Sequence, residues 1–176
     1  IELEEQQHVY KLLERASRTL QLDWGPVKAD VIRGPDGPVL IEVTPRFHGD
    51  VSTSFCCPIA HGVSPVQHWM QWLSNARLPE QDVFLRDTCK AGWAGIFPRH
   101  VGTVEKINGV QHALELPGIV KVLLRRGPGW RVQHLGDNRA VLGFLFATGH
   151  DSVQVRKRLS AAIEKIQVVM SHENTP

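Results

Sequence analysis

The sequence predicts an α+β fold, in which helices pack on antiparallel sheets in two successive parts of the chain. Two observations carry this prediction. Segments with helical apolar periodicity stand near both ends of the 176-residue chain, and short strand-like segments separated by glycine and proline turns lie between them. A hydrophobic content of 42% is typical of a globular protein that buries a core.

The first part of the chain is expected to contain a long helix, a β-hairpin and a shorter helix. Apolar residues recur every three or four positions near the start, as in an amphipathic helix. Gly34-Pro35-Asp36-Gly37 suits a hairpin turn, and Ser64-Pro65 suits a helix start. The expected elements are a helix at 2–22, strands at 27–33 and 38–44, and a helix at 64–73.

The second part follows a polar segment at 74–90 that is expected to be a linker or a loop with a strand. From residue 91 the sequence changes to short apolar runs with glycine turns, which indicates antiparallel strands. A second long amphipathic segment stands near the end. The expected elements are strands at 92–98, 102–107, 119–124, 131–134 and 141–148, a helical turn at 110–114, and a helix at 151–169.

The two strands of the predicted hairpin each carry one acidic residue, and these two residues are expected to lie opposite each other. Side chains alternate along a strand, so Val39, Ile41 and Val43 are expected to face a core together. The opposite face then holds Asp30 and Glu42, which the short turn brings across from each other. Two carboxylates in that arrangement repel, and a bound cation is the simplest reason to keep them there.

Oxygen ligands of this kind, completed by water and phosphate oxygens, are typical of a magnesium site that holds a nucleotide. Thr44 can add a hydroxyl ligand or a hydrogen bond. Arg46, just after the strand, can bind a phosphate or a carboxylate through two N–H groups. The alternative is a hydrated acidic strand face followed by an ordinary surface arginine, and spacing alone leaves both interpretations open.

The stretch LDWGPVKADV, a glycine turn and then VLIEVTPRFHGD resemble the end of the ATP-grasp fold. In that family an acidic strand residue precedes a Glu-x-Asn-x-Arg motif, and a loop glycine follows. Asp30, Glu42, Arg46 and Gly49 match these positions, and Glu42 stands 12 residues after Asp30, as in the family. Thr44 departs from the pattern, because the family has asparagine there and threonine offers only a shorter hydroxyl.

The second part of the chain resembles the C-terminal domain of ATP-grasp ligases of the L-amino-acid ligase and carboxylase type. The similar segments are VGTVEKINGVQHALELPGIVKVLLRRGPGWRV and DNRAVLGFLFATGHDSVQVRKRLSAAIEKIQV. Together the two resemblances cover nearly the whole chain. They imply the end of an ATP-grasp domain at 1–73, a linker at 74–90, and a small ligase-associated domain of antiparallel strands and a long helix at 91–176.

The resemblance implies an ATP-dependent carboxylate–amine ligase of an amino-acid or dipeptide-forming type, which activates a carboxylate as an acyl phosphate. Asp30, Glu42 and Thr44 would hold Mg²⁺, with Mn²⁺ as an alternative ion, against the phosphates of ATP. Arg46 would be catalytic, stabilising the acyl phosphate or holding a substrate carboxylate. Gly49 would complete the ATP site, and the loop at 47–54 would border the acceptor pocket.

The family's upstream subdomains, which supply the loop over the phosphates and the adenine site, have no counterpart in this sequence. We therefore expect a C-terminal fragment of a longer enzyme that is inactive on its own. Two alternatives stay open. One is a biotin-carboxylase or carbamoyl-phosphate type of ATP-grasp enzyme that activates bicarbonate, and the other is a non-catalytic binding domain that keeps only the scaffold.

Charge and cysteine content restrict the class of partner. A formal net charge of +2 is too small to indicate nucleic acid binding, and no apolar run is long enough for a membrane helix. Cys56, Cys57 and Cys89 form no Cys-x-x-Cys motif, which indicates a reducing compartment such as the cytoplasm, and Cys56 and Cys57 are expected to be buried structural thiols. The expected partners are ATP and small carboxylate and amine substrates, and a homodimer is left open.

Overall fold

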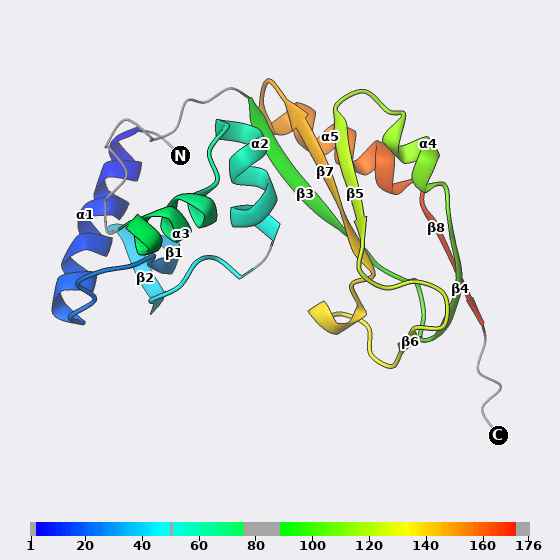
Figure 1. Ribbon diagram of the computed structural model, residues 1–176, viewed down its shortest axis with the longest axis horizontal. Helices are drawn as coiled ribbons and strands as arrows, with labels where there is room; N and C mark the ends of the chain where they lie inside the picture. Colours follow the sequence, from blue (N-terminus) through cyan, green and yellow to red (C-terminus); the bar gives the residue numbers. More distant parts are fainter. Residues whose placement is uncertain (1–2, 50, 76–88, 172–176) are drawn as a thin grey trace. The chain divides into compact units, whose positions relative to one another are not determined.

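The computed structural model describes residues 3–49, 51–75 and 89–171, and it has the α+β architecture that the sequence predicts (Figure 1). Every sheet in these ranges is antiparallel. No helix within them is both long and apolar enough to cross a membrane.

The chain divides into two compact units. The first comprises Ile1–Thr53 and Pro65–Pro79, and the second comprises Ser54–Ser64 and Glu80–Pro176. Most of the linker predicted at 74–90 lies outside the described residues, so its structure is not compared with the prediction.

A long helix and a two-stranded sheet form the first unit together with a second helix. α1 (Leu3–Thr19) packs on β2 (Gly37–Thr44), which pairs with β1 (Lys28–Gly34), and α3 (Pro65–Asn75) follows later in the chain. Arg33 of β1 ties the sheet to α1, because its Nε–H donates to Glu5 Oε1 at 2.6 Å. The predicted apolar stripe of α1 is half-buried at Val9, Leu12, Leu13 and Ala16.

A β-bulge in the hairpin changes the predicted distribution of side chains between its faces. The register shifts after Asp30, where Val31 pairs with Leu40 and Ile41 becomes the extra residue. Leu40 is therefore half-buried, whereas Val39 and Ile41 are 46% and 59% exposed. The prediction that Val39 and Ile41 face a core is wrong, because strict alternation fails at a bulge.

Two three-stranded sheets make up most of the second unit. Their strand orders are β3-β7-β5 and β6-β4-β8. α5 (Ser152–Ile163) packs on β3 and β7, and α4 (Val110–Leu114) contacts both β5 and α5 along the same side of the sheet (Figure 1). The strands are β3 (Lys90–Ile96), β4 (Gly102–Asn108), β5 (Ile119–Leu124), β6 (Arg131–Val132), β7 (Gly143–Gly149) and β8 (Gln167–Ser171).

The central strand β7 is buried on both faces. Leu145 and Ala147 belong to the same core cluster as Leu159 of α5. The alternate residue Phe146 contacts Phe55 instead, with ring centroids 4.9 Å apart. Phe55 lies in the π-helix η1 (Ser52–Cys56), which leads into α2 (Cys57–His61), so α5 and η1 cover opposite faces of this strand.

The helix predicted at 151–169 is wrong in its second half. α5 begins after Asp151, whose carboxylate accepts the Gln154 N–H at 2.7 Å, and it ends at Ile163. Residues 167–171 form β8, which pairs with β4. Val168 and Val169 suit a strand. The spacing of apolar residues, on which the helix prediction rests, does not show that a segment pairs with a distant strand. The other predicted helices and strands are confirmed to within a few residues.

Two smaller expectations also need correction. The loop predicted at 47–54 ends earlier, because η1 begins at Ser52. Cys56, Cys57 and Cys89 form no disulfide and are only half-buried, although burial does raise the pKa of the Cys57 thiol. They are therefore partly accessible thiols rather than fully buried ones.

Gly109→Ala is expected to destabilise the second unit. Gly109 has a φ of +78°, and a Cβ atom there would collide with the carbonyl oxygen of Lys165, shortly before β8. We expect the melting temperature to fall by about 5 °C or more, since strain and displacement together exceed about 2 kcal/mol. Gly129→Ala is the matched control, because its φ is +88° and nothing lies within 4 Å. An equal fall in both variants would contradict this explanation.

Candidate active site on the hairpin

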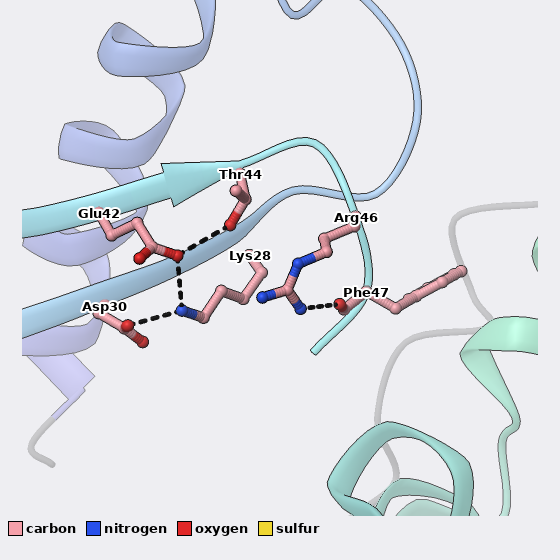
Figure 2. A network of polar contacts seen from close by, with 6 residues as sticks. All are labelled: Lys28, Asp30, Glu42, Thr44, Arg46 and Phe47. Atoms are coloured by element: carbon pink, nitrogen blue, oxygen red, sulfur yellow. Dashed lines mark hydrogen bonds and ion pairs between the residues drawn. The ribbon is translucent and has the colours of Figure 1, made fainter. Parts of the chain in front are cut away.

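The hairpin places the two predicted acidic residues directly opposite each other. Asp30 of β1 pairs with Glu42 of β2, and Lys28 pairs with Thr44 two positions away. Both pairs lie on the same side of the bulge, where the strands alternate regularly. The four side chains therefore share one face of the sheet (Figure 2). The carboxylates are accessible, with side chains that are 52% and 51% exposed.

A lysine ammonium lies between the two carboxylates. Lys28 Nζ donates to Asp30 Oδ2 at 2.6 Å and to Glu42 Oε1 at 3.1 Å (Figure 2). The Lys28 side chain is only 10% exposed, so it is shielded from solvent, whereas the carboxylates of Asp30 and Glu42 are accessible. The hydrogen bond to Asp30 is the main cause that raises the pKa of Lys28, against the opposing effect of desolvation, and Lys28 is therefore a cation at neutral pH.

The threonine that departs from the family pattern contacts the same acidic residue. Thr44 Oγ1 donates to Glu42 Oε1 at 3.3 Å, so this oxygen accepts hydrogen bonds from both Thr44 and Lys28. The hydroxyl thus lies close enough to the carboxylates to belong to one polar network with them (Figure 2). Its present role is to orient Glu42.

Arg46 and Gly49 stand beside this network without joining it. Arg46 Nη1 donates to the carbonyl oxygen of Phe47 at 2.9 Å, and among the described residues it has no hydrogen bond to either carboxylate. A Cβ atom at Gly49 would lie 3.1 Å from Arg46 Nη1, so a side chain there would crowd the guanidinium. Arg46 is exposed, and within the described residues only one of its guanidinium N–H groups, on Nη1, donates a hydrogen bond, to Phe47.

A cavity of about 500 Å³ opens next to Arg46 within the first unit. The residues that line it include Pro45, Arg46, Phe47 and two tryptophans. These tryptophans, Trp24 and Trp69, stack with ring centroids 5.8 Å apart. Asp23 also lines the cavity, so its charged groups are one cation and one anion. A cavity of this size with aromatic walls can bind a small organic molecule.

The donor set fits a metal ion that keeps part of its shell for water and phosphate. Asp30 and Glu42 supply hard carboxylate oxygens, and Thr44 supplies a neighbouring hydroxyl. The described residues contain no group of three or more histidine, cysteine, aspartate or glutamate side chains that could hold a metal on their own. Two carboxylates open to solvent are therefore suited to Mg²⁺ bound together with a nucleotide, not to a site made of protein ligands only.

The role of Lys28 could not be predicted from the sequence, although its position could. Lys28 stands two residues before Asp30 and therefore lies on the same strand face. That alternation was the available signal. A lysine on a half-exposed strand usually points its ammonium into water, so the contacts with both carboxylates become evident only in three dimensions.

Residues 95–171 match the family model of the L-amino acid ligase C-terminal domain 2. This part of the chain is similar to that domain of the L-amino acid ligases. The matched residues make up most of the second unit and contain all of its strands except the start of β3. The hairpin that carries Asp30 and Glu42 lies outside the matched residues.

Comparison with solved structures extends the likeness to nearly the whole chain. L-amino acid ligase from Bacillus licheniformis superposes with a TM-score of 0.82 at 19% identity, over 98% of this chain and 44% of that one. The biotin carboxylase domain of 2-oxoglutarate carboxylase from Hydrogenobacter thermophilus, solved with MgADP, ADP and bicarbonate, has a TM-score of 0.65 at 14% identity. It covers 97% of this chain and 37% of that one. Both are ATP-grasp ligases, and this chain has the fold of their C-terminal portions.

A relative in sequence is an uncharacterised protein of Sinorhizobium fredii. It is 25% identical over 163 residues, which cover 93% of this chain and 33% of that protein. The chain thus spans about a third of this relative and less than half of each of the two solved structures above.

Proposed function

We propose that this chain is the C-terminal portion of an ATP-dependent carboxylate–amine ligase that uses an amino acid as a substrate. The observation that carries the proposal is the carboxylate pair Asp30 and Glu42, directly opposite each other on a hairpin of the ATP-grasp fold. The L-amino acid ligase domain at 95–171 supports the choice of an amino acid as substrate.

In this proposal Asp30 and Glu42 hold Mg²⁺ with ATP, and Thr44 orients Glu42 or contributes its hydroxyl. The MgADP in the Hydrogenobacter biotin carboxylase structure supports ATP and Mg²⁺ as the cofactors. The ion supplies charge neutralisation at the phosphates. The chain's own contribution is to keep two carboxylates at one point of a rigid hairpin, with Glu42 further fixed by two hydrogen bonds.

The reaction proposed for the whole enzyme is the transfer of the γ-phosphoryl group of ATP to a carboxylate. The bond from the γ-phosphorus to its bridging oxygen breaks, ADP leaves, and an acyl phosphate forms. An amine then attacks the acyl carbon and displaces phosphate, which yields an amide. Arg46 is suited to hold the carboxylate and then the acyl phosphate, since its guanidinium is exposed beside the cavity.

Two alternative functions that the sequence leaves open are each supported by one observation. The bicarbonate in the Hydrogenobacter structure favours a carboxylase-type enzyme, in which bicarbonate replaces the amino acid. The ammonium of Lys28 between the carboxylates favours a non-catalytic domain, in which a lysine has replaced the metal ion. Cys56, Cys57 and Cys89 form no disulfide, which agrees with a cytoplasmic location for each of these candidate functions.

The experiment that tests the proposal is an assay of phosphate release by the intact protein with ATP, Mg²⁺ and a panel of amino acids. We expect release that depends on an amino acid and is accompanied by a dipeptide or another amide. Release that depends on bicarbonate alone would select the carboxylase alternative, and no release with any acid would select the non-catalytic one. The 176-residue chain alone is expected to be inactive.

Thr44→Asn is expected to keep or raise the activity of the intact protein. The amide oxygen of asparagine reaches further from the backbone than the threonine hydroxyl, so it can approach a metal ion beside Glu42 more closely. Turnover of ATP at subsaturating Mg²⁺ is the measurement. If Thr44→Asn abolishes turnover while Thr44→Ser is neutral, the hydroxyl has a function that the amide cannot replace.

A further inference from the structure

We propose that Lys28 is a positioning residue whose ammonium takes the place of a metal ion between Asp30 and Glu42 and withdraws when an ion binds. The inference rests on the proposed function, because it assumes that the two carboxylates are metal ligands. It goes beyond that function by assigning to Lys28 an exchange between two positions.

The contacts of the ammonium are those of a resident cation. It donates to one oxygen of each carboxylate, at 2.6 Å to Asp30 and 3.1 Å to Glu42. Like charges opposite each other on a sheet destabilise it, so a cation between them is what keeps the pair in place. Lys28 therefore does for the metal-free hairpin what a bound ion does in the loaded site.

The same contacts oppose binding of the ammonium and a metal ion at the same time. Oxygens Asp30 Oδ2 and Glu42 Oε1 are engaged by the ammonium, and Glu42 Oε1 also accepts from Thr44. A divalent ion bound by both carboxylates would place two positive charges next to the ammonium, where repulsion is strong. One of the two cations has to leave, and the lysine is the one attached to a flexible stem.

Withdrawal gives Lys28 a second position on the same face of the hairpin. Its side chain is 10% exposed in the present structure, so any movement away from the carboxylates brings the ammonium into solvent or onto a ligand. An ammonium carries three N–H donors and no acceptor, and phosphate oxygens are its natural partners beside a nucleotide. Entry of the ion and the release of a phosphate-binding cation are thus coupled.

The withdrawal is tested by brief acetylation of the protein's lysines, with and without saturating Mn²⁺ and without nucleotide. Lys106, an exposed lysine on strand β4, serves as the reference. Mass spectrometry should show Lys28 acetylated several-fold more slowly than Lys106 in the absence of Mn²⁺, and at a comparable rate in its presence. An unchanged Lys28 rate while Mn²⁺ is bound would overturn the exchange and leave the metal site standing.

The competition is tested by the affinity for Mn²⁺ in the presence of ATP, measured by electron paramagnetic resonance. Lys28→Met should bind Mn²⁺ about tenfold more tightly than the unchanged protein, whereas Lys28→Arg and the control Lys106→Met should not. A charge that merely lies near an exposed site would change the affinity only a few-fold, because solvent screens it. If Lys28→Met binds Mn²⁺ equally well or more weakly, Lys28 is structural only. If no variant binds Mn²⁺ saturably, the metal site and the exchange both fail.

Discussion

Glu42→Ala is expected to lower ATP turnover of the intact enzyme by at least about 100-fold. The variant removes the carboxylate that faces Asp30 across the hairpin and accepts hydrogen bonds from both Lys28 and Thr44. A nucleotide-bound Mg²⁺ would lose one of its two protein carboxylates, and charge neutralisation at the phosphates would weaken accordingly. The measurement is the rate of ADP formation at saturating ATP and substrate.

The fold of this variant is expected to survive, because Lys28 keeps its 2.6 Å hydrogen bond to Asp30. A melting temperature within a few degrees of the unchanged protein would separate loss of the site from loss of the structure. Glu14→Ala is the control, since Glu14 is an exposed carboxylate on α1 that pairs with Arg18. Turnover by Glu42→Ala that equals turnover by Glu14→Ala would discard the metal assignment.

Arg46→Ala is expected to lower kcat by about 100-fold to 1,000-fold. The guanidinium stands at the wall of the cavity and spends one N–H group on the Phe47 carbonyl, so its other donors can hold a carboxylate or an acyl phosphate. Removal of one well-placed donor to a charged transition state has an effect of this size. Arg46→Lys should recover only part of the rate, because an ammonium cannot form the two-pronged contact.

The control for this prediction is Arg18→Ala. Arg18 is an exposed arginine of the first unit that pairs with Glu14 on the surface of α1. Its replacement should leave both kcat and KM unchanged. If Arg46→Ala raises KM with kcat intact, Arg46 holds the ground-state substrate only and plays no part in stabilising the acyl phosphate.

The approximate position of the carboxylate pair could be predicted because it depends on local structure. The short turn places Asp30 near Glu42, and alternation places Lys28 with Asp30 on β1 and Glu42 with Thr44 on β2. The pairing that starts at the turn would put Asp30 opposite Ile41 if it continued without a break. The bulge after Asp30 shifts the pairing by one residue and brings Glu42 directly opposite Asp30, and the sequence does not indicate this shift.

The errors arise where the structure depends on contacts between distant residues. Leu40 and Ile41 are both apolar and both fit a strand, so nothing in the sequence indicates which of them the bulge turns outward. Val168 and Val169 continue an apolar pattern that began in α5, and only pairing with β4 makes them a strand. The spacing of apolar residues indicates which side chains are buried, but it does not indicate which element they pack against.

Lys28 has one property that follows from local structure and one that does not. Its strand face follows from alternation, but its hydrogen bonds to Asp30 and Glu42 depend on the conformation of a long side chain. The cation expected between the two carboxylates is thus supplied by the chain itself, as the ammonium of Lys28. The balance between this ammonium and a metal ion becomes the main question about the site.

The most direct measurement of the central claim is the affinity of Mn²⁺ for the intact protein in the presence of ATP, followed by electron paramagnetic resonance. The comparison is between the unchanged protein and the double variant Asp30→Asn, Glu42→Gln, which keeps the size of both side chains and removes their charges. The account predicts saturable binding that weakens by about 100-fold in the double variant. Equal affinity in the two proteins would contradict the assignment of this carboxylate pair as the metal site.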